Sequence, residues 1–312
     1  MEMDRRTWIT DLLGQQCFDH LASELSGAQV QSLLLEVMRQ RAAARTPAQI
    51  LSQYEAGRFC TPAAADPRVS LAIDNELFTA ATEFEAIELS PVAPLGACST
   101  IALTDQNRVL SALRTSEVVA DPTNVLALEC ARRLRKRWNS PVHLATSQRV
   151  VRAQPVPALP GYAPHFRLFT LASGGREREN HAFSVDSLVQ HVRTTLQALD
   201  RLERRGYAFG KRRLELLATP QRGEIGDRIA EQIGALAVRG PLEHPYSTGG
   251  LRYTLWATPV DGPEVPLADG GAFDWLSKLT SNRRAVFVAS GVGTQLIELR
   301  FRAAPAQVPR AT

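Results

Sequence analysis

The spacing of apolar residues changes along this chain of 312 residues, from a helical pattern in the first part to alternating helix and strand patterns from residue 67 onward. Within residues 30–38 the apolar positions recur at the spacing of one helix face, and Ser26 stands where a cap would begin that helix. Thr46 followed by Pro47 marks a second helix start, because proline already has the backbone angle of a first helical position. We therefore expect residues 1–66 to form a helical appendage that packs on the main domain or on a partner.

From residue 67 onward the pattern alternates between helices and strands. Long amphipathic stretches predict helices, which are 123–138, 184–205 and 225–236. Shorter apolar or alternating runs predict strands, which are 143–151, 166–172, 214–218, 253–258, 285–289 and 294–302. Because most strands gather late in the chain with helices between them, we expect an α+β domain over residues 67–312, with a mainly antiparallel sheet flanked by helices.

Composition is that of an ordinary globular protein. The chain is 44% hydrophobic and 22% charged, and no run approaches the roughly 20 apolar residues that span a bilayer. The N-terminus lacks the features of a secretory signal, so we expect a cytoplasmic protein with no membrane contact. The four cysteines form no metal-ligand pattern with each other or with histidine. We therefore expect reduced, mostly buried thiols and no structural metal.

The net charge of +4 does not by itself establish a nucleic-acid partner. Arginines gather near the ends of two expected helices, at 132–137 and 201–205. Cations at a helix C-terminus interact favourably with the helix dipole, so a solvated helix end is the simpler interpretation. A phosphate-contacting surface is the alternative, which keeps RNA binding among the functional hypotheses.

Four stretches, in order along the chain, resemble the landmarks of class II aminoacyl-tRNA synthetase cores of the histidyl type. Residues 84–91 are similar to the family's first motif, whose proline helps to build a dimer interface, so the resemblance implies a homodimer. The most specific stretch is Arg152-Ala153-Gln154, followed by a Pro- and Gly-rich loop and a strand from His165. It resembles motif 2, in which two antiparallel strands hold ATP. The Arg-Ala-Gln variant is also similar to the histidyl-like regulatory subunit of ATP phosphoribosyltransferase.

This resemblance implies a nucleotide site, with ATP and Mg²⁺ as the ligand. Arg152 would contact the α-phosphate, because a planar guanidinium binds phosphate through two hydrogen bonds and keeps its proton. Gln154 replaces the more usual Glu of the family. His165 or Arg167 would face the nucleotide, although His165 is equally well explained as a strand-end histidine bonded to backbone.

A second group of residues resembles the family's amino-acid site. Arg114 is retained in the loop that holds the substrate's amino group, and Glu117 is the candidate for the acid in that loop. A helix-start or surface carboxylate is the alternative interpretation of Glu117. Tyr246 lies in a segment that faintly resembles the family's Asp-Tyr-Tyr-Thr-Gly sequence.

The fourth stretch consists of two glycine segments near the C-terminus. Asp269, Gly270 and Gly271 are similar to the start of the family's Gly-Gly-Arg-Tyr-Asp segment, and the resemblance implies amino-acid binding. Gly291 and Gly293 are similar to a glycine-rich turn from strand to helix, and they would bind the nucleotide. Glycine suits both places because it lets the backbone approach a ligand closely.

Two departures from the family pattern affect catalysis. Ala272 and Leu296 stand where active synthetases carry arginines. Adenylation needs cations aimed at the phosphates, and losing one such donor typically costs on the order of 10²–10³ in rate. The chain also ends soon after Leu296, so we expect no anticodon-binding domain.

The resemblance and its departures lead to three functional hypotheses. The first is a non-charging relative of the synthetase core, in a regulatory or accessory role, that binds a nucleotide or an amino-acid-like molecule. A protein partner would fit such a role. The second is an ATP-dependent ligase or transferase that activates a small acid with Arg152 and Arg114. The third is an RNA-binding module that uses the arginine-rich helix ends.

Overall fold

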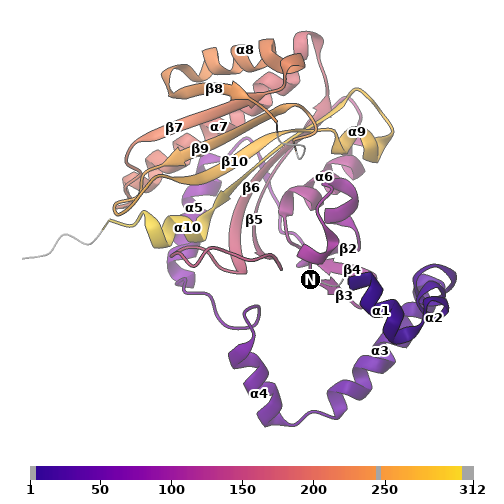
Figure 1. Ribbon diagram of the computed structural model, residues 1–312. Helices are drawn as coiled ribbons and strands as arrows, with labels where there is room; N and C mark the ends of the chain where they lie inside the picture. The colour runs from indigo at the N-terminus through magenta and orange to yellow at the C-terminus, as the bar shows by residue number, and fades with distance from the viewer. Residues whose placement is uncertain (1–4, 244–246, 304–312) are drawn as a thin grey trace, which may run out of the picture.

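A computed structural model describes residues 5–243 and 247–303 of the chain (Figure 1). Among these residues, no helix is both long and apolar enough to cross a membrane. The main domain is built on one eight-stranded sheet. Its strands are β1 (Glu85–Ala86), β5 (Val142–Val151), β6 (His165–Arg176), β7 (Arg212–Ala218), β8 (Ala237–Pro241), β9 (Leu251–Ala257), β10 (Val265–Phe273) and β11 (Ala285–Gly293).

The strand order of this sheet is β1-β5-β6-β11-β10-β9-β7-β8. The two edge pairs, β1 with β5 and β7 with β8, are parallel, and every other pair is antiparallel. The expected α+β domain with a mainly antiparallel sheet is therefore confirmed. A separate small sheet joins three short strands, which are β2 (Val92–Pro94), β3 (Ser111–Ala112) and β4 (Ser116–Val118).

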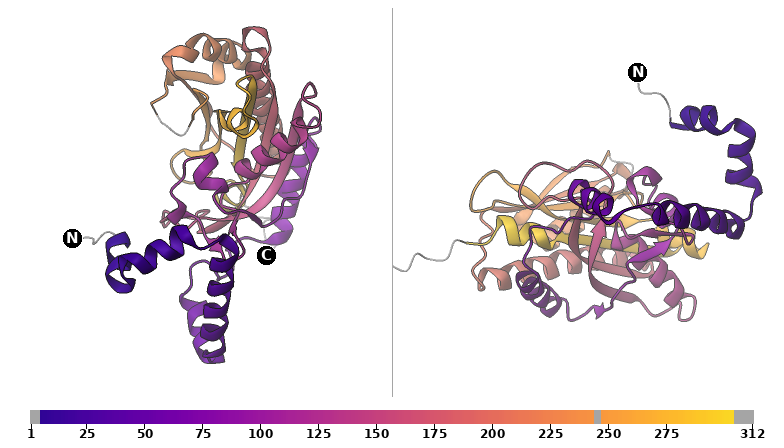
Figure 2. Two further views of the ribbon diagram at one scale, coloured as in Figure 1. Left: turned by 90° about the vertical axis from the view of Figure 1, so that its right-hand side faces the viewer. Right: turned by 90° about the horizontal axis from the view of Figure 1, so that it is seen from below.

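Helices cover both faces of the large sheet (Figures 1 and 2). They are α5 (Pro67–Ala80), α6 (Pro122–Leu134), α7 (Ala182–Glu203), α8 (Gly223–Ile233), α9 (Trp275–Thr280) and α10 (Thr294–Arg300). Helices α5 and α7 share one hydrophobic core with the sheet, and α6 and α9 share a second core with it. Side chains alternate between the two faces of a strand, so β5, β6, β10 and β11 contribute to both cores, whereas the apolar residues of β7 and β9 lie in the first. Tyr253 packs in the first, for example, and Phe287 in the second.

One element expected as a strand is a helix. Residues 294–302 were expected to form a strand, but Thr294–Arg300 form α10 after β11 ends at Gly293. The reason is the spacing of the buried apolar residues. Leu296, Ile297 and Phe301 are one and four positions apart, which places them on one side of a helix, where they pack against the α5 and α7 core.

The N-terminal appendage is helical, as predicted, and projects away from the sheet domain (Figures 1 and 2). Ser26 and Thr46 both cap helices, each through a reciprocal capping box. No residue of α2, α3 or α4 is buried, so these helices bury little surface against the main domain, although Gly27 at the start of α3 lies near Thr115. The helices are α1 (Arg5–Leu13), α2 (Gln15–Asp19), α3 (Gly27–Ala43) and α4 (Pro47–Ala56), with a π-helical turn at His20–Glu24.

The cysteines only partly match the expectation of buried thiols. All four are free, but Cys17 and Cys60 are exposed, while Cys98 and Cys130 are buried. Burial raises the pKa of Cys98 to about 11 and that of Cys130 to about 12. Both buried thiols are therefore protonated near neutral pH, which makes them poor nucleophiles.

The second arginine-rich helix end is not simply solvated. Arg201 pairs with Glu76 of α5 at 2.8 Å, and Arg205 pairs with the same carboxylate at 3.0 Å. The Glu76 side chain is only 5% exposed. These arginines therefore join α7 to α5 and neutralise a buried carboxylate.

Candidate functional site

A row of polar residues and one glycine crosses six neighbouring strands of the large sheet. The strand registers set these residues opposite one another from β7 to β5, in the order Glu215, Thr254, Asp269, Gly291, Thr170 and Thr146. We call these six residues the polar row. Tyr253 and Ser290, their neighbours along the strands, lie on the α7 side, so alternation turns the polar row to the opposite face.

Two members of the polar row carry buried hydroxyls without a partner. Thr146 and Thr170 are fully buried, and within the described part of the chain neither hydroxyl forms a hydrogen bond. A buried hydroxyl without a partner costs about 1–3 kcal/mol. Such groups are uncommon in folded proteins and mark places where a polar partner from outside would be favourable.

The centre of the polar row is open. A Cβ at Gly291 would have no other atom within 4 Å. Its neighbour Asp269 has a side chain that is 51% exposed and is paired with Arg252 of β9. Free space above a glycine therefore lies beside the Thr170 hydroxyl, with the Asp269 carboxylate one strand further and its partner Arg252 on the strand after that.

Packing explains the two other glycines of this region. A Cβ at Gly270 would lie 2.6 Å from Cβ of Ser290 and 2.7 Å from the Tyr253 ring. A Cβ at Gly271 would lie 2.4 Å from the Leu251 carbonyl oxygen. Both positions thus need glycine for close strand packing, whether or not a ligand binds there.

Gly293 ends β11, and a Cβ there would make only an ordinary contact with Leu296, at 3.4 Å. Glycine at this position is therefore not demanded by packing. The turn that follows leads directly into α10, which agrees with the strand-to-helix turn that the resemblance implied.

Arg152 lies where β5 ends, beside the N-terminus of α6. Its Nε donates to the carbonyl oxygen of Ala120 at 3.0 Å, and one Nη lies 3.4 Å from a carboxylate oxygen of Asp121. Asp121 is also the N-cap of α6 and accepts from the Thr123 amide. The guanidinium, 5.1 Å from the Phe166 ring centre, is thus placed by three groups but remains partly exposed.

The other residues predicted to bind the nucleotide hold structural elements together. The Gln154 carbonyl accepts a hydrogen bond from Arg58. His165 donates from Nε2 to the Thr61 carbonyl at 2.7 Å, which is the backbone-bonded alternative considered above. Arg167 pairs with Asp74 of α5 at 3.1 Å, on the side of the sheet opposite the polar row. Binding of a nucleotide by these residues stays a prediction, and it would compete with these contacts.

The residues predicted to hold an amino acid are dispersed. Arg114 is exposed, in the turn between β3 and β4. Glu117 is fully buried, and its carboxylate accepts hydrogen bonds from the Gly96 and Cys98 amides at 2.8 and 2.9 Å. It therefore fixes the loop after β2. Tyr246 lies outside the described residues.

Both positions where the resemblance expects an arginine are packed. Ala272 is buried, and a Cβ at Gly249 would come within 2.8 Å of it. Leu296 is also buried and lies against Gly161 in the loop between β5 and β6. The longer arginine side chain would not fit at Ala272 without moving the backbone of Gly249.

Sequence reasoning found two members of the polar row, Asp269 and Gly291. It missed Thr146, Thr170 and Thr254, because threonine is common in strands and carries no motif. Glu215, and Arg252 beside the row, were also missed, because a charged residue within a strand carries no motif of its own. The register of six strands brings them together, and no local pattern reports that register.

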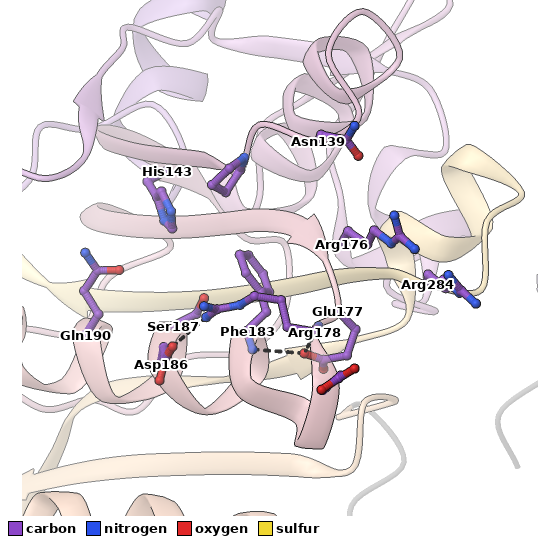
Figure 3. Close-up of a pocket in the computed structure, with 12 residues that line it drawn as sticks. Asn139, His143, Arg176, Glu177, Arg178, Phe183, Asp186, Ser187, Gln190 and Arg284 are labelled. Atoms are coloured by element: carbon purple, nitrogen blue, oxygen red, sulfur yellow. Dashed lines mark hydrogen bonds and ion pairs between the residues drawn. The ribbon is translucent and has the colours of Figure 1, made fainter.

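A cavity of about 990 Å³ lies elsewhere, between the start of α7 and the loop before β5 (Figure 3). Phe183 and His143 line it, together with Arg176 and Arg284 at one end. Arg178 pairs with Asp186 within it at 2.5 Å. Glu177 is occupied in capping α7, where it accepts from the Ser184 amide and hydroxyl.

A buried chain of hydrogen bonds leads from this cavity into the sheet. Nδ1 of His143 lies 2.8 Å from the Ser173 hydroxyl, which lies 2.9 Å from Nε2 of His191. Nδ1 of His191 lies 2.5 Å from the Ser290 hydroxyl. Burial, with a smaller effect of His143, lowers the pKa of His191 to about 3. A neutral His191 donates at one nitrogen and accepts at the other, so the two hydrogen bonds made by its ring run in the same direction along this chain of hydrogen bonds.

No protein-family model matches this sequence, and no curated protein matches it. Solved structures of similar shape do exist. A histidine–tRNA ligase subunit from Alicyclobacillus acidocaldarius has 11% sequence identity and a TM-score of 0.58, covering 77% of this chain and 94% of its own. An ATP phosphoribosyltransferase regulatory subunit/histidyl-tRNA synthetase from Bacillus halodurans C has 12% identity and a TM-score of 0.56, covering 77% of this chain and 81% of its own.

Histidyl-tRNA synthetase from S. aureus is also similar, with 12% identity and a TM-score of 0.53, covering 74% of this chain and 65% of the enzyme. Identities this low establish the arrangement of the backbone and nothing about activity. The sheet order, the flanking helices and these likenesses agree with one another. The chain therefore has the fold of a class II aminoacyl-tRNA synthetase core.

Proposed function

We propose that this protein is a non-charging relative of the class II synthetase core, with a regulatory or accessory role. In this proposal a nucleotide or an amino-acid-like molecule binds at the polar row. The observation that carries the proposal is the pair of buried, unpartnered hydroxyls on Thr146 and Thr170, beside the open space at Gly291. A polar ligand that reached them would satisfy groups that the fold leaves without partners.

The charge of the site suits a ligand that carries both signs. Asp269 lies opposite Gly291, Arg252 pairs with Asp269 from the next strand, and Glu215 ends the polar row on β7. An amino acid could pair with both charges. If the ligand is ATP, Asp269 is the carboxylate best placed for its Mg²⁺, because Mg²⁺ usually takes one or two carboxylates together with phosphate oxygens.

The proposal that this protein does not charge tRNA depends on Ala272 and Leu296. Both are buried apolar residues at positions where the resemblance expects arginines, and the arginine expected at Leu296 would contact the γ-phosphate. If each missing arginine costs on the order of 10²–10³ in rate, two together place adenylation at roughly 10⁻⁴ or less of an active synthetase. Arg152 alone would remain to contact the α-phosphate.

RNA binding has less support than ligand binding. Arg132 and Arg133 pair with Glu129, and Arg201 pairs with Glu76. These ion pairs reduce the positive charge that each helix end offers to phosphates. Strong binding of RNA at low salt would restore this alternative.

Titration calorimetry with ATP, AMP and a panel of amino acids tests the ligand proposal. We expect at least one to bind, and Thr170→Val to weaken its binding tenfold or more, because a hydroxyl is replaced by a methyl group of similar volume. Thr79→Val, on the outer surface of α5, is the matched control and leaves binding unchanged. Binding that ignores Thr170→Val would place the ligand elsewhere.

Pyrophosphate exchange with the same amino acids tests the absence of charging. We expect no exchange above background. Robust exchange with any amino acid would overturn this part of the proposal and favour the ATP-dependent ligase or transferase.

The pairing of two copies through residues 84–91 also stays a prediction. Phe84 is buried against His143 and His191, whereas Pro91 is exposed and free to meet a second chain. A solution mass of one chain at all concentrations would contradict it.

A further inference from the structure

The N-terminal helices carry most of the exposed large apolar side chains of the described chain. Ten of seventeen lie between residues 8 and 54, each 39–66% exposed. They are Trp8, Leu12 and Leu13 on α1, Leu33, Leu34, Val37 and Met38 on α3, and Ile50, Leu51 and Tyr54 on α4. We call residues 5–56 the arm. An apolar concentration of this size is typical of an interaction surface.

The arm buries little surface against its own domain, which α3 approaches at Gly27, near Thr115. At its base, Arg58 donates to the Ala153 carbonyl at 2.5 Å, and Thr61 accepts from His165. At the elbow between α3 and α4, Arg45 donates to the Gln53 side chain and to the Gln49 carbonyl. These contacts fix the direction of α3 and α4, which project from the sheet domain (Figures 1 and 2). The arm therefore needs a partner from outside the chain.

The chemistry of the arm points to a protein partner. Residues 5–56 contain five arginines and five acidic residues, so the arm has no net charge to attract RNA or an anionic membrane. The area fits as well. If a large apolar side chain has roughly 150–200 Å² of surface, half of ten such side chains is roughly 750–1,000 Å². A stable interface buries about 800 Å² from each partner.

We propose that α3 packs antiparallel against α3 of a second copy of this chain, so that two arms form a two-fold interface. A register that sets Val30 opposite Val37 of the second copy also sets Leu33 opposite its Leu34. The same apolar stripe is then buried in both chains, as an isologous interface requires. Val30 is already partly buried within the arm, and the residues on either side of the stripe are mostly polar.

Charge supports the antiparallel direction. Arg39, Arg41 and Arg45 lie toward the C-terminal end of α3, while Glu24 precedes its N-terminus. In the register given above, Glu24 lies level with position 43 of the second copy, between its Arg41 and Arg45. A parallel pair would instead bring identical arginines together, which costs energy.

The flanking helices follow the same symmetry. Helices α1 and α2 precede the N-terminus of α3 in the chain, and α4 follows its C-terminus. Antiparallel pairing therefore brings α4 of one copy beside α1 of the other. The stripe of Ile50, Leu51 and Tyr54 then meets that of Trp8, Leu12 and Leu13, so all ten exposed side chains are covered.

Disulfide cross-linking tests this interface independently of any contact between the sheet domains. In a full-length chain with Cys17→Ser and Cys60→Ser, a cysteine in place of Leu34 lies close to the two-fold axis. We expect Leu34→Cys to form a covalent dimer under mild oxidation. Ser32→Cys, on the opposite side of α3, is the matched control and should remain mostly monomeric. Equal cross-linking of the two variants, or none by Leu34→Cys, overturns the proposal.

A second measurement uses the unmodified cysteines. We expect Val37→Glu to raise the dissociation constant of the association through the arm at least tenfold in sedimentation equilibrium, and Ser32→Glu to leave it unchanged. Any pairing through residues 84–91 is the same in both variants and in the native protein. Circular dichroism checks that each variant keeps its helices. A native protein that is monomeric at all concentrations, or an unchanged constant for Val37→Glu, overturns the proposal and leaves the arm as a surface for a different protein.

Discussion

At the scale of single residues, His191 shows how burial sets the chemistry of a side chain. Two serine hydroxyls satisfy its ring nitrogens, and the ring lies fully inside the core beside Phe84. Its pKa of about 3 is far below the ordinary value of about 6.5. The folded protein therefore binds a proton at His191 much more weakly than the unfolded chain does.

This difference predicts a loss of stability in mild acid. Above about pH 6.5 both states are neutral at this residue. As the pH falls below 6.5 the unfolded chain is protonated first, so the free energy of unfolding decreases until the pH nears 3. At pH 5 the contribution of His191 is roughly 2 kcal/mol. Urea unfolding at pH 7 and pH 5 measures it.

His191→Gln removes the titrating group and should flatten this pH dependence by about that amount, although it lowers stability at both pH values. Ser32→Ala, a non-titrating side chain on the exposed arm, is the control and keeps the native dependence. An equal dependence in native protein and His191→Gln would show that His191 is not the group responsible. Burial lowers the pKa of His143 as well, but this residue is present in both the native protein and His191→Gln.

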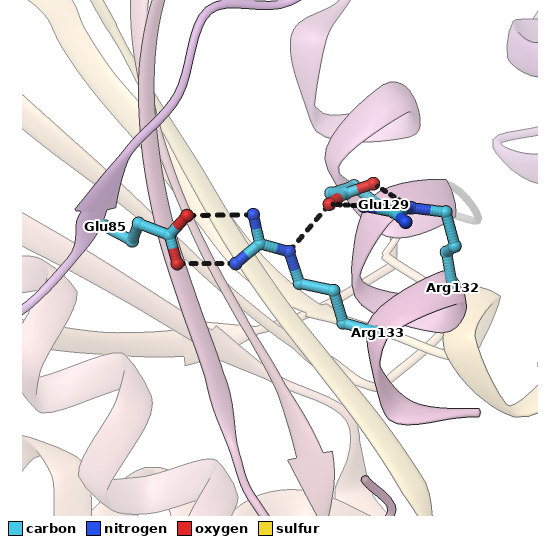
Figure 4. A network of polar contacts seen from close by, with 4 residues as sticks. All are labelled: Glu85, Glu129, Arg132 and Arg133. Carbon is cyan, nitrogen blue, oxygen red and sulfur yellow. Dashed lines mark hydrogen bonds and ion pairs between the residues drawn. The ribbon is translucent and has the colours of Figure 1, made fainter. Parts of the chain in front are cut away.

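At the scale of elements, Arg133 joins α6 to the edge strand β1 (Figure 4). Two of its nitrogens lie 2.5 and 2.9 Å from the Glu85 carboxylate, and Nε lies 2.6 Å from Glu129. Arg132 also pairs with Glu129, at 2.7 Å. These arginines lower the pKa of Glu129 to about 2.

We expect Arg133→Met to lower the free energy of unfolding by about 1 kcal/mol, because a bidentate pair between two elements is lost and the side chain is partly exposed. Arg132→Met should change the free energy of unfolding by less than about 0.5 kcal/mol, since Arg132 is exposed and pairs with Glu129 of its own helix. Chemical denaturation measures both. The difference between the variants should shrink in 1 M salt, and a larger effect of Arg132→Met would contradict this ranking.

At the scale of the whole molecule, the arm and the sheet domain are energetically separate within one chain. No residue of α2, α3 or α4 is buried, and the linker contacts made by Arg58 and Thr61 lie outside the arm. Removal of residues 1–56 should therefore leave the domain folded, with the same thermal midpoint as the full chain at low protein concentration. A drop of more than about 4 °C, or roughly 1 kcal/mol, would contradict this separation.

The sequence by itself determined most of the elements and the class of fold. Caps such as Ser26, Thr46 and Asp121 were readable because helix starts use local chemistry within four residues. The glycine and Arg-Ala-Gln segments pointed to the synthetase-like arrangement that the solved structures share. Residues 294–302 were misassigned because a short apolar run fits either period.

Only the tertiary structure decided what the predicted site residues do. Glu117, His165 and Arg167 read as ligand-binding groups, yet each is occupied by a backbone or carboxylate from a distant segment. The polar row, in turn, depends on the register of six strands, which no single segment specifies. Burial and pairing across long sequence distances are properties of the packed chain, so local patterns identify the elements but not the partners of their side chains.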